Sequence, residues 1–329
     1  MIPRALWPLT SLYATLVATK NAVYDRGLAK AQQLRWPVIS VGNISVGGSG
    51  KTPFAIALAK LLKQQGALVD VLSRGYGRRS SVVECVDPAG SAERFGDEPL
   101  LIAQSADVPV YVGASRYAAG LLAERDQPGA GIHLLDDGFQ HRKLARAMDI
   151  VLLHRSDFDE SLLPAGRLRE SLNSLKRASV LVLRKEDSNV EERLRGLGID
   201  KPIWPIKRSI MVPSSLGKAV AFCGIAHPDE FFAMLKLQGV EVIAMHAFRD
   251  HHRYSDDDVQ FLMQQAEKHS ASAFLTTEKD LVRLSPAQRE KFSSLAAFDA
   301  VRLKVQLCDE AAAMRHLELL LPAGFKRLL

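Results

Sequence analysis

One stretch near the N-terminus, residues 38–62, constrains the fold of this chain more than any other. The β-branched run at 38–41 predicts a buried strand, which a glycine-rich turn and an amphipathic helix follow. Strand, glycine loop and helix N-terminus together indicate a phosphate-binding P-loop, because the glycines let backbone N–H groups converge on phosphate oxygens. The predicted nucleotide-binding residues are Ser45, Gly47, Gly48, Ser49, Gly50, Lys51, Thr52 and Pro53.

Three residues of this loop have specific expected roles. Lys51 is placed to reach the β- and γ-phosphates, and the hydroxyl of Thr52 to bind Mg²⁺. Pro53 is tolerated, because a residue at the start of a helix needs no N–H partner. The usual pattern G-x-x-x-x-G-K-[ST] has a glycine where this chain has Ser45, and two later glycines supply the flexibility. An ordinary helix-capping turn is the alternative, but G-K-T between a hydrophobic strand and a helix favours the phosphate site.

Composition narrows the class of protein. A length of 329 residues favours two domains, and 47% hydrophobic with 24% charged residues is ordinary for a folded soluble protein. The net charge of +6 fits anionic partners such as nucleotides, phospholipid surfaces or nucleic acid, although a basic protein without an electrostatic purpose is the alternative. The three cysteines lack metal-ligand spacing, which argues for a reducing compartment and against a disulfide framework.

Residues 1–35 differ from the rest of the chain. The stretch at 5–19 carries no charge and several leucines, but is shorter than the roughly 20 residues that span a bilayer. Basic residues flank it, and no small-residue cleavage site of a secretory signal is present. This pattern predicts a helix that lies in the membrane interface. A first helix packed on the protein's own core is the alternative.

Strand and helix signals alternate along the chain after the P-loop. Because the strands are continuous apolar runs, they predict an α/β fold with a parallel sheet covered by helices on both faces. Prolines and serines cluster at 200–217, which indicates a domain boundary. A second, smaller α/β domain is predicted after it. The last strand and the final helix, 309–321, are expected to return to the first domain.

Polar loops follow several predicted strands. Arg74 on a glycine loop is well placed to meet phosphate, with a solvated basic loop as the alternative. Asp136 and Asp137 end an apolar strand, where P-loop proteins hold Mg²⁺; a simple polar turn is the alternative. Asp97 and Glu98 suit a general base or a metal contact as well as they suit helix capping, and the residues alone leave this open.

His251 and His252 form an adjacent pair in a polar loop. Histidine is the side chain best suited to move protons near pH 7, but such a pair is more often surface decoration. No third ligand stands at metal spacing, so no zinc site is predicted.

Taken together, eight motifs resemble one family, the tetraacyldisaccharide 4′-kinases of lipid A biosynthesis. Ser45 in place of the first glycine also resembles this family, which often has proline where this chain has Arg167. No role is assigned to Arg167. The motifs are VGNISVGGSGKTP at 41–53, LSRGYGR at 72–78, GDEP at 96–99, LDDGFQHRKLARAMDIVLL at 135–153, LLPAGRLRE at 162–170, AFCGIAHPDEFF at 221–232, FRDHH at 248–252 and TTEKD at 276–280.

The resemblance implies transfer of the ATP γ-phosphate to the 4′-hydroxyl of an acylated glucosamine disaccharide 1-phosphate, giving lipid IVA. It implies a peripheral or monotopic protein on the cytoplasmic face of a Gram-negative inner membrane. It also implies a two-stranded linker between the two domains, with the active site between them. The expected organisation is a membrane-interface helical segment at 1–35, a P-loop kinase domain at 36–208, the smaller domain with the linker at 209–305, and a C-terminal helix at 306–329.

The resemblance also implies roles for single residues. Asp97 matches the family's proposed base and is paired with His251, while Lys51 serves catalysis and phosphate binding. The implied cofactors are ATP and Mg²⁺, and the implied metal-binding residues are Thr52, Glu98, Asp136 and Asp137. The implied substrate-binding residues are Asn43, Arg74, His141 and Arg169.

Two other classes of function compete with this reading. A P-loop ATPase switch of the partitioning or metal-insertion kind shares G-G-x-G-K-T but has no sugar acceptor. A binding module on nucleic acid is disfavoured, because aromatic residues make up 7% of the chain and no arginine stripe with aromatic stacking residues is present. The sequence does not indicate an oligomeric state.

Overall fold

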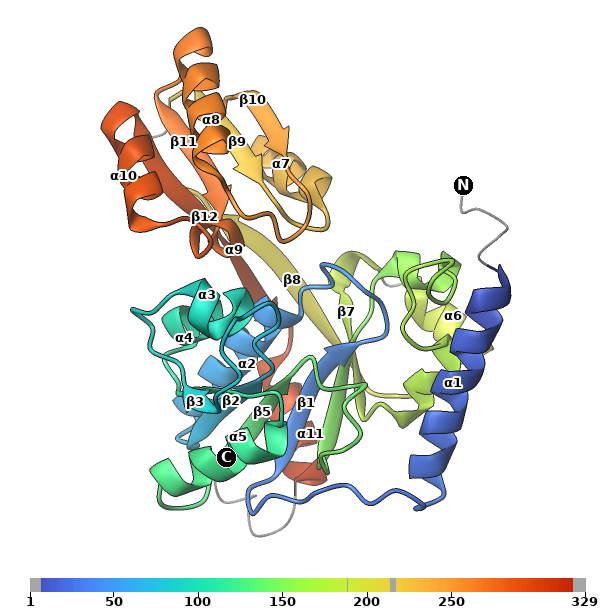
Figure 1. Cartoon of the computed structure of the whole chain (residues 1–329). Helices are drawn as coiled ribbons and strands as arrows, with labels where there is room; N and C mark the ends of the chain where they lie inside the picture. Colours follow the sequence, from blue (N-terminus) through green and yellow to red (C-terminus); the bar gives the residue numbers. More distant parts are fainter. Residues whose placement is uncertain (1–6, 188, 214–216, 322–329) are drawn as a thin grey trace.

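The computed structural model describes residues 7–187, 189–213 and 217–321. In this part of the chain one twelve-stranded sheet runs through the whole molecule, in the order β10-β9-β11-β12-β8-β7-β6-β1-β5-β2-β4-β3 (Figure 1). Its neighbouring strands are parallel except β12 with β8 and β3 with β4. The α/β fold class predicted from the sequence is therefore confirmed, with antiparallel pairs at these two places.

The larger part of the molecule contains β1 to β7 and the P-loop helix α2. Its strands are β1 (Val38–Asn43), β2 (Val69–Ser73), β3 (Glu84–Cys85), β4 (Val110–Val112), β5 (Ile132–Asp136), β6 (Met148–Leu152) and β7 (Val180–Arg184). Its helices are α1 (Trp7–Asp25), α2 (Lys51–Gln64), α3 (Ala92–Phe95), α4 (Asp97–Ala106), α5 (Arg116–Asp126) and α6 (Val190–Gly196), with 3₁₀ turns at Arg155–Asp159, Leu172–Arg177 and Lys185–Asp187.

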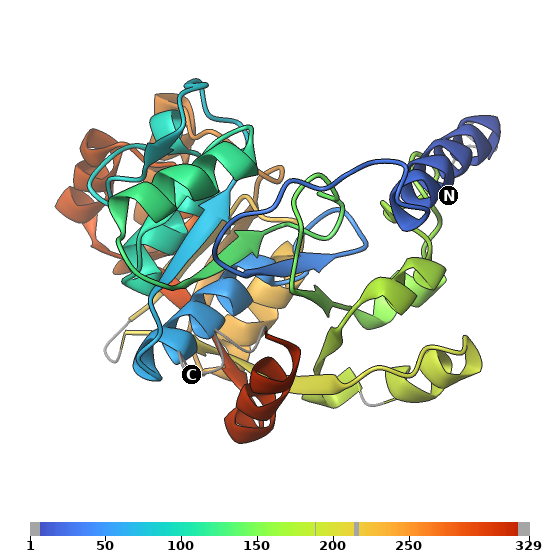
Figure 2. The same ribbon diagram turned by 90° about the horizontal axis from the view of Figure 1, so that it is seen from below.

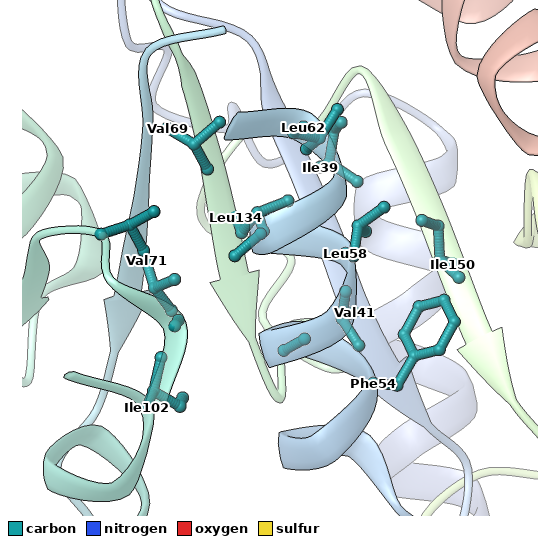
Figure 3. Packing of buried hydrophobic residues seen from close by; sticks show 14 of the residues in the cluster. Ile39, Val41, Phe54, Leu58, Leu62, Val69, Val71, Ile102, Leu134 and Ile150 are labelled. Atoms are coloured by element: carbon teal, nitrogen blue, oxygen red, sulfur yellow. The ribbon is translucent and has the colours of Figure 1, made fainter. Parts of the chain in front are cut away.

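Helices cover both faces of this part of the sheet. On one face, Phe54, Leu58 and Leu62 of α2 are fully buried against Ile39 and Val41 of β1 (Figure 3). Helices α4 and α11 (Glu310–Leu320) pack on the same face, whereas α5 and α6 pack on the other. Each fully buried aliphatic or aromatic side chain contributes about 1.5–3 kcal/mol, so α2 and the P-loop before it are held firmly to the central strand.

The turn between β1 and α2 depends on glycine. Gly50, the residue before α2, has φ +86°, and Gly47 has φ +100°. Residues other than glycine rarely adopt a backbone conformation with positive φ. The turn therefore delivers Lys51 as the first residue of α2, with Thr52 buried beside it.

The smaller part continues the sheet. Helix α7 packs on one of its faces, and α8 and α10 pack on the other. Its strands are β8 (Ile203–Met211), β9 (Ala219–Cys223), β10 (Val242–Ala247), β11 (Ala273–Thr277) and β12 (Ala297–Leu307). Its helices are α7 (Pro228–Leu237), α8 (Asp256–His269), α9 (Glu278–Leu281) and α10 (Pro286–Leu295).

The proline cluster at 200–217, which indicated a domain boundary, contains strand β8. Strand β8 runs through it from the larger part into the smaller one, and β12 pairs with it antiparallel on the way back. Pro205 lacks an N–H to donate, but its carbonyl accepts from the N–H of Cys308 and keeps that hydrogen bond to the chain after β12. Residues 214–216 lie outside the described residues. Helix α11 then returns to the larger core, as predicted.

Helix α1 contacts the larger part with one face and leaves the other uncovered. Figure 2 shows it at the periphery of the larger part. The Tyr13 hydroxyl donates to the carbonyl of Arg169, while the nearby Leu9, Leu12 and Leu16 are 53–61% exposed. Among the described helices, none is long and apolar enough to cross a membrane. Residues 1–6 of the predicted interface segment lie outside the described residues.

Candidate active site

A cleft of about 520 Å³ lies between the two parts of the molecule. The P-loop and the loops after β2 and β5 line one side of it, so it opens at the carboxyl ends of parallel strands. Residues of β8, α7, α9 and the His251 loop line the other side. Any ligand in this cleft is therefore contacted by both parts.

At the P-loop end of the cleft, charged side chains form a network of hydrogen bonds and ion pairs. The ammonium of Lys51 donates to Asn43 Oδ1 at 3.1 Å and lies 3.5 Å from Asp137 Oδ1. Arg169 donates two hydrogen bonds, of 2.7 and 2.8 Å, to the Asp137 carboxylate and also donates to Asn43. Burial raises the pKa of Asp137, but Arg169 and Lys51 outweigh it and hold the pKa well below its usual range. Two cations are thereby positioned beside the P-loop.

Asp136, by contrast, is a buried carboxylate with an unused oxygen. Its Oδ2 lies 3.4 Å from the Ser73 hydroxyl, whereas its buried Oδ1 has no hydrogen-bond partner among the described residues. Burial and the nearby carboxylates Glu98 and Asp137 raise its pKa to about 7. Leaving such an atom unpaired is costly, and a cation ligand would remove that cost. The buried Thr52, the second residue of α2, lines the same cleft.

The described residues contain no group of three histidine, cysteine or acidic side chains preformed around a metal. Glu98 pairs with Lys279 and Asp137 with Arg169. Magnesium commonly takes one or two protein carboxylates and completes its shell with phosphates and waters. The donor set around Asp136 and Thr52 therefore fits Mg²⁺ that arrives with a nucleotide.

The first two residues of α4 contact cations of the smaller part. Asp97 Oδ2 accepts from Arg283 Nε at 2.6 Å and lies 3.2 Å from His251 Nδ1. Glu98 Oε1 accepts from Lys279 Nζ at 2.9 Å. Burial raises the pKa of Asp97, but the hydrogen bond with His251 and the charge of Arg283 lower it below its usual value. A carboxylate that stays ionised thus lies where the two parts meet.

The structure gives the two adjacent histidines different surroundings; the residues alone left the choice open, and only the family resemblance favoured His251. His252 Nε2 lies 3.0 Å from Asp258 Oδ2 near the N-terminus of α8, and its ring stacks on Phe248. His251 lines the cleft instead, with its ring edge-on to that of Tyr76. His252 is therefore structural and His251 faces the site.

Comparison with known proteins agrees with this geometry. The family model described as tetraacyldisaccharide-1-P 4′-kinase matches residues 2–321. The tetraacyldisaccharide 4′-kinase of Koribacter versatilis (strain Ellin345) is 46% identical over 93% of this chain and 96% of its own length. The chain belongs to the tetraacyldisaccharide 4′-kinase family.

Two further relatives come from one organism. The tetraacyldisaccharide 4′-kinase of Aquifex aeolicus (strain VF5) is 40% identical over 86% of this chain and 90% of its own length. The crystal structure of LpxK from Aquifex aeolicus, described as an "apo" form in complex with ATP, superposes with a TM-score of 0.77 at 34% identity. That superposition covers 96% of this chain and 98% of the other. The chain is thus a kinase with the family's fold over nearly its whole length.

The enzyme brings nearly all of its sequence-predicted site residues to the same cleft. All but two of them line it. The lining residues are the P-loop residues from Ser45 to Pro53, together with Arg74, Glu98, Asp136, Asp137, His141, Arg169 and His251. Asn43 and Asp97 are not lining residues. Asn43 contacts Lys51 and Arg169, and Asp97 contacts His251.

His141 is neutral at physiological pH. Burial, together with the positive charges of Arg116 and Arg146, lowers its pKa to about 4. A neutral imidazole can donate from one nitrogen and accept at the other. Arg74 lines the same region from the loop after β2 and is exposed to solvent.

Sequence reasoning missed two cations of the smaller part, Lys279 and Arg283. Lys279 lies within the TTEKD motif, which was noted without a role, and Arg283 lies just beyond it. A signal was present, because Thr277 ends strand β11 and caps the short helix α9 that carries Lys279. Neither the motif nor the capping pattern reveals that both cations reach the acids of α4, which lie about 180 residues earlier.

The apolar end of the cleft was also missed. There Glu230 of α7 accepts hydrogen bonds from Arg184 and Arg208 at 3.0 and 3.1 Å. Apolar walls with a few fixed polar groups suit a flat heterocyclic ligand. The apolar residues that line this end are Ile210, Ile225, Phe231, Met234, Val301 and Leu303.

Proposed function

We propose that this enzyme transfers the γ-phosphate of ATP to the 4′-hydroxyl of a tetraacylated glucosamine disaccharide 1-phosphate, forming lipid IVA in lipid A biosynthesis. One observation carries the proposal. The cleft that contains the P-loop is also lined by His251, which contacts Asp97 behind it, so a phosphate site and a histidine–carboxylate pair meet at the same cleft. The names of the relatives support the identity of the acceptor.

Lys51 and the backbone N–H groups of the P-loop would bind the β- and γ-phosphates. Phosphoryl transfer depends on positioning and charge neutralisation more than on covalent help from the protein. Thr52 and Asp136 would hold Mg²⁺, with Glu98 and Asp137 close by. The bound ion would neutralise negative charge on the phosphates. Arg169 and Lys51 would exchange part of their contact with Asp137 for phosphate oxygens.

Asp97 is the proposed base. A sugar hydroxyl is a poor nucleophile, so a carboxylate that accepts its proton late in the transfer assists the reaction. The lowered pKa of Asp97 keeps it ionised at neutral pH. Asp97 belongs to the larger part and His251 to the smaller one. We therefore treat 36–208 and 209–305 as two domains whose closure assembles the site and limits ATP hydrolysis by water.

The remaining predicted residues would bind the lipid acceptor or align it with the nucleotide. Arg74 and Arg169 provide charge-assisted donors for phosphate oxygens, and neutral His141 provides a hydrogen bond without adding charge. Asn43 orders Lys51 and Arg169 by accepting from both at Oδ1.

The exposed leucines of α1 support peripheral attachment to the cytoplasmic face of the inner membrane, where the acylated substrate would lie. A helix with an apolar face and basic flanks can lie in the bilayer interface. Replacing Leu9, Leu12 and Leu16 together with serine should lower binding to anionic phospholipid vesicles in a sedimentation assay. Replacing exposed Leu237 of α7 in the same way is the control and should change nothing. Equal vesicle binding by the triple variant and the wild type would remove α1 from the attachment.

The function is tested by incubating the enzyme and Mg²⁺ with ATP and tetraacyl disaccharide 1-phosphate in detergent. Mass spectrometry of the lipid should then show one added phosphate, and ³¹P NMR should place it on the 4′-oxygen. ATP consumption should depend on the lipid. Free phosphate released equally with and without lipid would instead support the ATPase-switch alternative.

A further inference from the structure

Arg283, in the turn after α9, is a buried cation at the contact between the two parts of the enzyme. Its side chain is 3% exposed. The guanidinium donates to Asp97 Oδ2 at 2.6 Å, to the carbonyl of Gly224 at 2.8 Å and to Asp280 Oδ1 at 3.0 Å. Its Nη2 lies 3.2 Å from His251 Nδ1. A planar donor group bound in so many directions has a fixed orientation.

Two neighbouring groups compete for a hydrogen bond with His251 Nδ1. This nitrogen lies 3.2 Å from Asp97 Oδ2, which can accept, and 3.2 Å from Arg283 Nη2, which can only donate. In a neutral imidazole, Nδ1 is either a donor or an acceptor. If Nδ1 carries the proton, its N–H faces an N–H of Arg283. If Nε2 carries it, Nδ1 accepts from Arg283.

The lengths of the contacts favour the second arrangement. Asp97 Oδ2 already has a charge-assisted hydrogen bond of 2.6 Å from Arg283 Nε, which is shorter than its 3.2 Å contact with His251. The guanidinium, rather than the imidazole, is thus the principal partner of Asp97. The same rigid group presents its Nη2 donor to the imidazole.

The backbone of His251 is tied to the same network. Its φ is +59°, a left-handed conformation that a histidine adopts only where the surroundings hold it. Its N–H donates at 3.1 Å to the carbonyl of Gly224, which also accepts from Arg283. One carbonyl therefore fixes both the histidine backbone and the guanidinium.

From this geometry we propose that Arg283 is a positioning residue that orients Asp97 and holds neutral His251 in the tautomer with its proton on Nε2. His251 then has an N–H donor for a ligand in the cleft that it lines, and Asp97 is oriented by Arg283. Because Arg283 and Asp97 come from different parts of the molecule, Asp97 is oriented when α9 lies against α4. The kinetic consequence of this inference rests on the proposed function, but the tautomer does not.

The tautomer can be measured without substrate. Long-range ¹H–¹⁵N NMR of histidine side chains in the full chain, at about pH 8 where an ordinary histidine is neutral, identifies the protonated nitrogen. His251→Gln assigns the signal. The wild type and Asp97→Ala should show the proton on Nε2, and Arg283→Met should show it on Nδ1, donating to Asp97. A proton on Nδ1 in the wild type, or on Nε2 in Arg283→Met, would overturn the inference.

Kinetics give a second readout. Arg283→Met should lower kcat about 100-fold, the cost typical of a misplaced catalytic group, with the KM for ATP near that of the wild type. Arg283→Lys keeps the charge without the planar fork, so it should recover only part of kcat. Lys291→Met, which removes a surface cation of α10 paired with Asp256, is the control and should retain kcat. An unchanged kcat in Arg283→Met would count against the inference.

Two safeguards keep the result interpretable. Arg283→Met removes a partner of buried Asp280, so its thermal unfolding is compared with that of the wild type. If it does not fold, the spectra of the wild type and Asp97→Ala decide. A wild type that phosphorylates no lipid while His251 carries its proton on Nε2 removes the proposed function and leaves this inference standing. A wild type that phosphorylates the lipid while His251 carries its proton on Nδ1 overturns this inference and leaves the proposed function standing.

Discussion

The P-loop end of the active site and the end around Asp97 are built in different ways. The P-loop end comes mostly from neighbours in sequence, because β1, the glycine turn and the start of α2 lie within residues 38–53. The Asp97 end is assembled from α4, the His251 loop and the turn after α9, and Asp97 lies more than 150 residues before both His251 and Arg283. The P-loop end is therefore formed within one part of the molecule, whereas the Asp97 end exists only where two parts meet.

If this contrast is correct, the largest effect comes from the P-loop end. Lys51→Met should lower kcat/KM about 1,000-fold, because it removes a phosphate-directed charge and one of the two cations beside Asp137. Both ATP affinity and kcat should fall. The check is steady-state kinetics together with ATP binding by calorimetry, with Lys60→Met, an exposed residue of α2, as the control. ATP affinity like that of the wild type would show that Lys51 does not bind the nucleotide.

A mutation at the other end should separate the two functions. His251→Ala should lower kcat about 100-fold and leave ATP affinity nearly unchanged, because His251 contacts Asp97 and Arg283 rather than the P-loop. His252→Ala is the matched control for the loop. It should cost stability, through lost packing on Phe248 and the lost contact with Asp258, more than it costs kcat. If His251→Ala keeps a normal kcat, the histidine has no part in the reaction.

The smallest effect concerns stability at the P-loop side of the cleft. The pKa of His141 is about 4 in the folded chain, below the value of 6.5 expected when unfolded. The unfolded chain therefore binds more protons there, so this contribution to stability is complete above about pH 6.5 and is lost as the pH falls toward about 4. Urea unfolding at about pH 7 and pH 5 should show a smaller loss of unfolding free energy in His141→Gln than in the wild type. An equal loss would contradict the assignment.

The same contrast explains what the sequence could predict. The P-loop, the acids after β5 and the strand pattern are local signals, and the structure has them within a few residues of their predicted positions. Strand β8 was missed because its prolines indicated a boundary, although Pro205 pairs with Leu183 in the sheet and its carbonyl accepts from Cys308.

The partners of Asp97 and Glu98 were beyond such reasoning. Nothing in the GDEP motif indicates that Arg283 and Lys279 will meet these two acids, because that depends on how β8 and β12 carry the smaller part over α4. The family resemblance favoured His251 over His252, but the physical reason, the contact of His252 with Asp258, is visible only in the fold.

The most direct test of the account is a single turnover with [γ-³²P]ATP bound before the lipid acceptor is added, comparing the wild type with Asp97→Ala. We predict that both proteins bind ATP with similar affinity, that the wild type transfers the label to the lipid, and that the variant retains it on ATP. Transfer at the wild-type rate by Asp97→Ala, or loss of ATP binding in that variant, would contradict the division of labour between the two ends of the cleft.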